Sequence, residues 1–190
     1  QPGHRQLPRP RERIGDQKAE QATAAKPDQN QKAGKYLTFA LAEEEYGLEI
    51  LKVREIISMS EITSVPKTPG FVKGVINLRG MVIPVIDLRL KFAMAEIPYT
   101  DETCIIVVNV NEVEMGIIVD HVSEVLDISG GDIEDPPAFG SNVDMDFILG
   151  MGKTDQRVTI LLDIDKVLSG QDKPVLQALA QTNQDPVKQN

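Results

Sequence analysis

The stretch of sequence that decides the fold is PGFVKGVINLRGMVIPVID, residues 69–87. It contains two apolar runs, residues 71–76 and 81–86, which are separated by the tetrapeptide Asn77-Leu78-Arg79-Gly80. Val and Ile dominate both runs, and β-branched side chains favour a pleated strand over a helix. Two such runs joined by a short turn-forming segment predict a β-hairpin.

The same pattern of apolar runs and polar turns continues on both sides of this hairpin. Short helices are expected at residues 87–92 and 163–168, where Asp163 is suited to an N-cap. Further strands are expected at residues 35–41, 46–50, 51–59 (with a kink), 104–110, 115–119, 122–128, 147–151 and 158–164. The sequence therefore predicts an all-β fold with one or two short helices.

The two halves of the chain resemble each other, which indicates an internal duplication. Any two β-rich segments align weakly, so this interpretation competes with chance. A first alignment places Glu43, Glu45, Gly47, Val53, Glu55 and Ser60 on Glu112, Glu114, Gly116, Val122, Glu124 and Ser129, and Ile56 on Val125. A second alignment, further along the chain, places Phe71, Gly74 and Asp87 on Phe147, Gly150 and Asp163. Self-similarity of this kind sets the architecture. It predicts two small barrels of about five strands each, because closing a sheet removes its exposed edges.

The two ends of the chain differ in composition from the part between them. Residues 1–34 have few apolar side chains and a net charge of +3, from seven basic and four acidic residues. Such a segment buries too little surface to offset its ordering entropy, so we expect a disordered basic tail. Residues 171–190 are expected to form a flexible C-terminal tail. The folded domain then spans residues 35–170, with subdomains at about 35–95 and 100–170, and exchange of strands between the subdomains is left open.

The charge of the folded part argues against binding to nucleic acid or to anionic lipid. The whole chain has a net charge of −9, so residues 35–190 carry −12, and such a surface repels phosphates. Aromatic residues make up only 4% of the chain, too few for a surface that stacks bases. A nucleic-acid-binding barrel is therefore only a remote alternative.

No constellation of residues in the sequence predicts catalysis, and we expect neither enzyme activity nor a cofactor. A nucleophile elbow, a phosphate-binding loop and paired metal-ligand spacings are all missing. His121 has no second histidine in the folded part to act with, and residues 130–135 lack the calcium-loop pattern. Cys104 is the single cysteine, as is consistent with a reducing compartment. No apolar run approaches the roughly 18 residues of a membrane helix, so direct membrane insertion is not expected.

Three stretches, residues 45–56, 69–89 and 116–126, resemble the chemotaxis coupling protein family CheW. The Asn-Leu-Arg-Gly turn is specific in this setting, and the similarity covers residues 35–170. The resemblance implies two SH3-like five-stranded β-barrel subdomains. It also implies a non-catalytic scaffold that couples transmembrane chemoreceptors to the histidine kinase CheA. The implied partners are the regulatory domain of CheA and the cytoplasmic tip of methyl-accepting chemoreceptors. The implied location is the cytoplasm, with recruitment to membrane-associated receptor arrays.

The resemblance further implies an apolar groove between the barrels that receives the helical tip of the receptor. The residues it assigns to partner binding are Val53, Glu55, Gly74, Asn77, Arg79, Gly80, Val122 and Val125. Val53 and Glu55 are two apart, so on a regular strand they would share one face. For each valine, plain core packing is an equally good interpretation. Arg79 is expected to contact Glu55, because its planar guanidinium can bind a carboxylate at two points.

Two alternatives within the family remain. The chain could be a detached coupling domain of the kinase, or part of a coupling–receiver fusion. The sequence shows no phosphoacceptor domain, ATP-binding module or receiver module, which disfavours both if the chain is complete. Gly74 and Gly80 are expected to serve a close backbone approach or a positive φ first, and an interface second.

Overall fold

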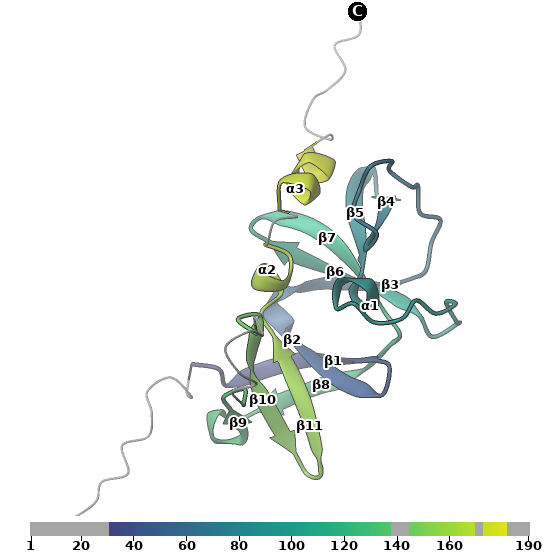
Figure 1. Ribbon diagram of the computed structural model, residues 1–190. Helices are drawn as coiled ribbons and strands as arrows, with labels where there is room; N and C mark the ends of the chain where they lie inside the picture. The colour runs from purple at the N-terminus through teal and green to yellow at the C-terminus, as the bar shows by residue number, and fades with distance from the viewer. Residues whose placement is uncertain (1–30, 138–144, 170–172, 182–190) are drawn as a thin grey trace, which may run out of the picture.

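The structure is a computed structural model that describes residues 31–137, 145–169 and 173–181. Within these residues the chain forms two β-sheets with a few short helices, so the expected all-β fold is confirmed. In Figure 1 the five-stranded sheet occupies the upper half of the molecule and the six-stranded sheet the lower half. No helix in the described part of the chain is long and apolar enough to cross a membrane.

The two sheets have the following hydrogen-bonded strand orders. The six-stranded sheet runs β8 (His121–Ile128), β1 (Gly34–Leu41), β2 (Glu44–Glu49), β11 (Arg157–Leu162), β10 (Ile148–Thr154), β9 (Ile133–Glu134). The five-stranded sheet runs β3 (Val53–Ser58), β6 (Cys104–Val110), β7 (Val113–Val119), β5 (Met81–Asp87), β4 (Val72–Leu78). The helices are η1 (Ile50–Lys52), α1 (Leu88–Lys91), η2 (Gly130–Asp132), α2 (Ile164–Val167) and α3 (Lys173–Gln181). The expected kinked strand at residues 51–59 is thus a turn of 3₁₀ helix followed by β3.

Strands are exchanged between the two halves of the chain. The hairpin of β1 and β2 joins the strands of the second half, and the hairpin of β6 and β7 joins those of the first. The exchange creates one parallel junction in each sheet, between β2 and β11 and between β5 and β7. Neither sheet therefore follows the contiguous boundaries at 35–95 and 100–170.

The two sheets fit the expected pair of subdomains, but neither sheet is a closed barrel. In each sheet the first and last strands of the order are not hydrogen-bonded to each other. The chain segments that connect β3 to β4 and β8 to β9 lie between these end strands and form only short pairings. After β3 the chain reaches Thr63, which exchanges two backbone hydrogen bonds of 2.9 Å with Val75 of β4. After β8 the chain reaches β9, which pairs with β10 over only two residues. The rest of these connecting segments forms no strand pairing, so neither sheet closes fully into a barrel.

The duplication is visible in equivalent contacts of the two halves. Gly47 of β2 lies opposite Leu161, and Gly116 of β7 lies opposite Val85. A Cβ atom at Gly47 would lie 2.9 Å from Leu161, and one at Gly116 would lie 3.3 Å from Val85. Both positions therefore favour glycine, because a side chain of the parallel neighbouring strand packs closely over the backbone there. The glycines are related by the first alignment of the sequence, and Val85 and Leu161 by the second.

The main hydrophobic core is continuous between the two sheets. Its buried residues include Phe39 and Leu162 from the lower sheet and Ile106 and Ile117 from the upper one. Four aromatic rings extend this core as a stack with centroid separations of 5.5–5.9 Å, formed by Phe39, Tyr46, Phe92 and Phe147. The two sheets thus pack as one body.

The ends of the folded region differ in part from expectation. Residues 173–181, expected in a flexible tail, form helix α3, and Leu176 is fully buried in the main core. The apolar side chains of this helix pack against β5 and β7, and this packing stabilises the helix. The expectation of a flexible tail is therefore wrong for these residues. At the other end, residues 31–34 of the expected disordered tail are described: β1 begins at Gly34, and Lys32 pairs with Asp135 at 3.0 Å. The remaining expected tail residues, 1–30, 171–172 and 182–190, lie outside the described residues.

Candidate partner-binding site

Two strands, β3 and β8, are unusually exposed. β3 contains no buried residue, and β8 buries only Ile128 at its end. Each lies at the end of its sheet and pairs with a single neighbour, β6 or β1. The two strands are equivalent under the first alignment of the sequence, so both halves present the same kind of surface.

A bulge decides which side chains of β3 share a face. Val53 pairs with Val108 of β6, but Glu55 pairs with Val107, so the register shifts between them. Val53 therefore faces the core between the sheets, whereas Ile57 packs against the separate core of the upper sheet, and the pairing puts Glu55 on the same face as Ile57. The expectation that Val53 and Glu55 share one face is wrong, because it assumed a regular strand.

The matching bulge in β8 brings Val122 and Val125 to one face. Val122 pairs with Phe39 and Val125 with Leu37, although they are three residues apart. The equivalent residues of β3 are Val53 and Ile56. Val53 and Val122 pack partly buried against the main core, while Ile56 and Val125 are 46% and 48% exposed. We call Val53, Ile56, Val122 and Val125 the apolar quartet.

Cys104 links the two exposed strands. It pairs with Ser58 at the end of β3, and its thiol accepts a hydrogen bond from the backbone of Val122 at the start of β8. Burial raises the pKa of this thiol, and the bond from Val122 opposes the shift. The structure therefore brings the quartet's two strands together at Cys104.

Arg79 and Glu55 form a two-point ion pair. Nη1 and Nη2 of Arg79 donate to Oε1 and Oε2 of Glu55 at 2.8 and 2.6 Å. The pair leaves Arg79 74% exposed, so a fixed guanidinium stands at the surface. This contact was expected, but the bulge places Glu55 on the opposite face of β3 from Val53. The ion pair is thus a neighbour of the quartet and not part of it.

The remaining predicted residues shape the backbone around Arg79. Arg79 and Gly80 form the two-residue loop between β4 and β5, with φ values of 52° and 88°. Two positive φ values fit the hairpin turn that matches strand twist. Asn77 holds the loop, because its Oδ1 accepts a hydrogen bond of 2.8 Å from Gly80 N. Gly74 lies apart from the loop, where a Cβ would lie 2.0 Å from Thr63 O, at the bridge that follows β3.

Comparison with known proteins places this geometry in a family. The family model described as a CheW-like domain matches residues 35–172. The chain belongs to the CheW family. The chemotaxis protein CheW of Klebsiella aerogenes is 40% identical over 148 residues, covering 78% of this chain and 89% of the relative. That of Thermotoga maritima is 37% identical over 135 residues, covering 70% and 85%.

A solved CheW structure shares the fold. The scaffolding protein TtCheW of Thermoanaerobacter tengcongensis aligns with a TM-score of 0.67 and 38% identity, covering 73% of this chain and 94% of that one. A longer relative is also similar: chemotaxis protein CheV3 of Helicobacter pylori is 30% identical over 126 residues, which cover 40% of its length. This chain is therefore also similar to a part of a larger protein.

One member of the quartet, Ile56, is missing from the residues predicted for the site. The signal was present, because the first alignment of the two halves places Ile56 on Val125. Strand periodicity gave the wrong answer at this position, since it placed Glu55 with Val53. The duplication was therefore a better guide to the exposed face than alternation within one strand.

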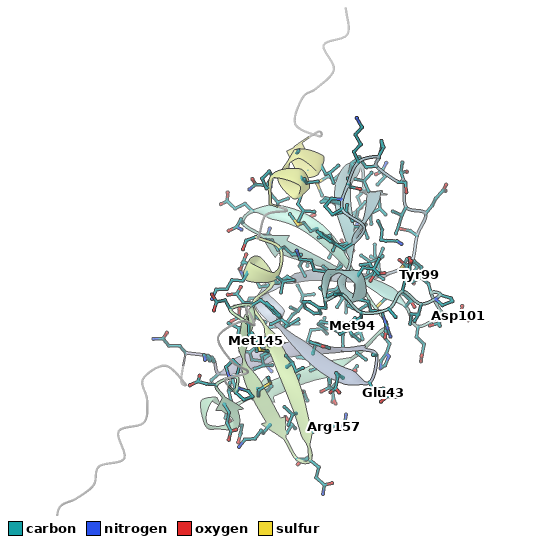
Figure 2. All side chains as sticks on the ribbon, viewed as in Figure 1. Glu43, Met94, Tyr99, Asp101, Met145 and Arg157 are labelled. Atoms are coloured by element: carbon teal, nitrogen blue, oxygen red, sulfur yellow. The ribbon has the colours of Figure 1, made fainter. Side chains whose placement is uncertain are left out.

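An apolar cavity of about 470 Å³ lies where the segment after α1 meets β10 and β11. Met94 and Met145, both labelled in Figure 2, line it, and the other lining residues include Phe92, Phe147 and Ile160. No member of the quartet lines this cavity. The CheW-like fold thus has two separate apolar features, and the quartet is the one carried by equivalent strands.

Proposed function

We propose that this protein is a non-catalytic scaffold that couples transmembrane chemoreceptors to the histidine kinase CheA. The observation that carries the proposal is the pair of exposed, equivalent strands, each of which places two aliphatic side chains of the quartet on one of its faces. Relatives named chemotaxis protein CheW and a solved CheW described as a scaffolding protein support it. The protein would act in the cytoplasm, within arrays beneath the receptors.

The quartet is suited to an amphipathic helix, such as the cytoplasmic tip of a methyl-accepting receptor. Four aliphatic side chains on two strands offer an apolar surface to the apolar stripe of a helix, a common mode of peptide recognition. Ile56 and Val125 would form the contact directly, because about half of each residue's surface is already exposed. Val53 and Val122 would form its floor.

The regulatory domain of CheA is the second partner, and Arg79 is its proposed contact together with Glu55. The guanidinium is held in place by two hydrogen bonds yet is mostly exposed, so little ordering entropy remains to be lost on binding. Asn77 and Gly80 would serve this contact by shaping the loop, and Gly74 by closing the sheet behind it.

The test uses the full chain with a receptor cytoplasmic fragment and, separately, with the CheA regulatory domain. Val125→Asp places a charge in the quartet and should weaken receptor binding at least about tenfold. Val158→Asp is the matched control, because Val158 is a valine of β11 with 54% exposure that lies outside the quartet. Binding is measured by calorimetry. Failure of the parent protein to bind either partner would overturn the proposal.

A further inference from the structure

Two ion pairs connect the halves of the molecule at related positions. Arg89 of α1 pairs with Asp120, the residue between β7 and β8. Asp165 of α2 pairs with Lys52, the residue directly before β3. The second alignment of the sequence relates Arg89 to Asp165, and the first relates Lys52 to His121, the neighbour of Asp120. The charges are exchanged between the two pairs: the helix carries the base in the first pair and the acid in the second. The duplication therefore did not simply copy the ion pair.

The Arg89–Asp120 pair joins three segments. Arg89 donates from Nε to Oδ1 at 2.6 Å and from Nη2 to Oδ2, and both side chains are largely buried at 12% and 20% exposure. Asp120 Oδ2 also accepts a hydrogen bond of 2.8 Å from the backbone N of Ala42, in the turn between β1 and β2. Burial raises the pKa of Asp120, but the bonds from Arg89 and Ala42 outweigh it and hold the pKa below its usual value.

The Lys52–Asp165 pair is a more exposed version of the same connection. Nζ of Lys52 lies 2.5 Å from Oδ2 of Asp165, with side-chain exposures of 35% and 29%. The hydrogen bond to Asp165 raises the pKa of Lys52 despite partial burial. Removing this pair should disturb the fold less than removing the buried one.

Each pair lies at the start of one exposed strand. Val53 follows Lys52 directly, and Val122 lies two residues after Asp120. Each of these strands pairs with one neighbour and buries at most one side chain, so contacts at its start add to the restraint that its ladder provides. We propose that the Lys52–Asp165 and Arg89–Asp120 pairs are positioning residues that set the spacing of the apolar quartet. They would control partner affinity without touching the partner, and this inference rests on the proposed receptor contact.

The first test is a double-mutant cycle on the exposed pair, with the receptor cytoplasmic fragment as the probe. Lys52→Met and Asp165→Asn should each weaken binding about threefold to tenfold, and the double variant should be no weaker than either single one. Lys153→Met is the matched control, because it also removes an exposed lysine ion pair, the one with Glu134. That pair lies away from the starts of β3 and β8. Unfolding midpoints are measured in parallel. Binding as tight as in the parent, or strictly additive losses, would overturn the inference.

The second test does not depend on any partner. Cys104 is the only cysteine of the chain, and its thiol accepts a hydrogen bond from the backbone of Val122. If the Arg89–Asp120 pair holds the start of β8, Asp120→Asn should raise the rate of native-state thiol labelling at Cys104 about threefold to tenfold. Labelling is compared under conditions where both proteins are fully folded. An unchanged rate would overturn the positioning role of this pair.

The two tests separate this inference from the proposed function. If Val125→Asp abolishes receptor binding while the ion-pair variants bind like the parent, the positioning role fails and the receptor contact stands. If Val125→Asp has no effect on receptor binding, the receptor contact fails, and Cys104 labelling alone decides whether Asp120 positions β8.

Discussion

The β4–β5 turn of the first half and the β10–β11 turn of the second share a two-residue loop and a positive φ at its first residue, but they differ in chemistry. Arg79 and Asp155 are related by the second alignment of the sequence, and both have a positive φ, 52° and 51°. Arg79 binds Glu55 of β3, whereas Asp155 lies near Glu124, the equivalent of Glu55, around a small cavity. Two carboxylates cannot form an ion pair. The duplication thus preserved the loop length and the first positive φ, whereas the second loop residue, with a positive φ only at Gly80, and the side chains of the turn diverged.

The largest difference in stability between the two halves is expected at Gly74 of β4 and Gly150 of β10, which precede the two turns. Gly74→Ala should lower the free energy of unfolding by about 3 kcal/mol or more, because φ is +141° and the new Cβ would lie 2.0 Å from Thr63 O. Gly150→Ala should cost less, about 1–2 kcal/mol, because its φ is not positive and its close backbone contact, with Glu134 O, is 2.8 Å and not 2.0 Å. Urea denaturation of both variants tests the ranking, and equal losses would contradict it.

The helix caps Asp87 and Asp163 offer a second, smaller contrast. Each side chain accepts a hydrogen bond of 3.2 Å from the third backbone N of its helix, Leu90 or Lys166. Asp87 is buried and also accepts a bond of 3.1 Å from Tyr99. Asp87→Ala should therefore cost about 2–3 kcal/mol and Asp163→Ala about 1 kcal/mol in unfolding free energy. A larger loss at Asp163 would show that the cap contacts do not control stability.

The two ion pairs should lose their stabilising effect at opposite ends of the pH range. The folded-state pKa of Asp120 is lowered, so its contribution is complete above about pH 4, the unfolded value, and is lost as the pH falls through the folded value. The pKa of Lys52 is raised, so its contribution is complete below about pH 10 and is lost at higher pH.

These signs predict two different pH profiles. The stability difference between the parent and Asp120→Asn should shrink in acid, and that between the parent and Lys52→Met should shrink in alkali. The Arg89–Asp120 pair should persist in alkali, because a guanidinium stays protonated there. Unfolding free energies measured between pH 3 and pH 11, roughly the range that spans both reference pKa values, test this. A difference independent of pH in both cases would refute it.

The smallest effect on stability is expected at the turns themselves. Arg79→Asp should cost about 0.5–1 kcal/mol in unfolding free energy, since the ion pair is largely exposed, and Asp155→Arg should gain about 0.3 kcal/mol through Glu124. Of the two turn variants, Arg79→Asp should disturb array assembly or kinase control and Asp155→Arg should not. Glu55→Lys, which removes the partner of Arg79, should act like Arg79→Asp. Kinase activity in reconstituted receptor–CheA assemblies is the measurement. A loss of control with Asp155→Arg would show that both turns carry signalling contacts.

Much of the site was open to prediction from local pattern. The Asn77–Gly80 loop, its arginine and the contact with Glu55 follow from turn chemistry and from the family resemblance. The faces of β3 did not follow, because a bulge at Arg54 reverses the alternation that places Val53 with Glu55. Nothing in the local sequence of β3 marks this bulge, which arises from its pairing with β6.

By itself the sequence determined the strands, the turns between them and the repetition of both, because these depend on apolar spacing and on turn residues within a few positions. It also determined the family. The tertiary structure alone decided the exchange of the β1–β2 and β6–β7 hairpins, the burial of Leu176 and the ion pairs at Asp120 and Asp165. Each of these joins residues far apart in the chain, and their contact energies depend on packing that no local pattern encodes.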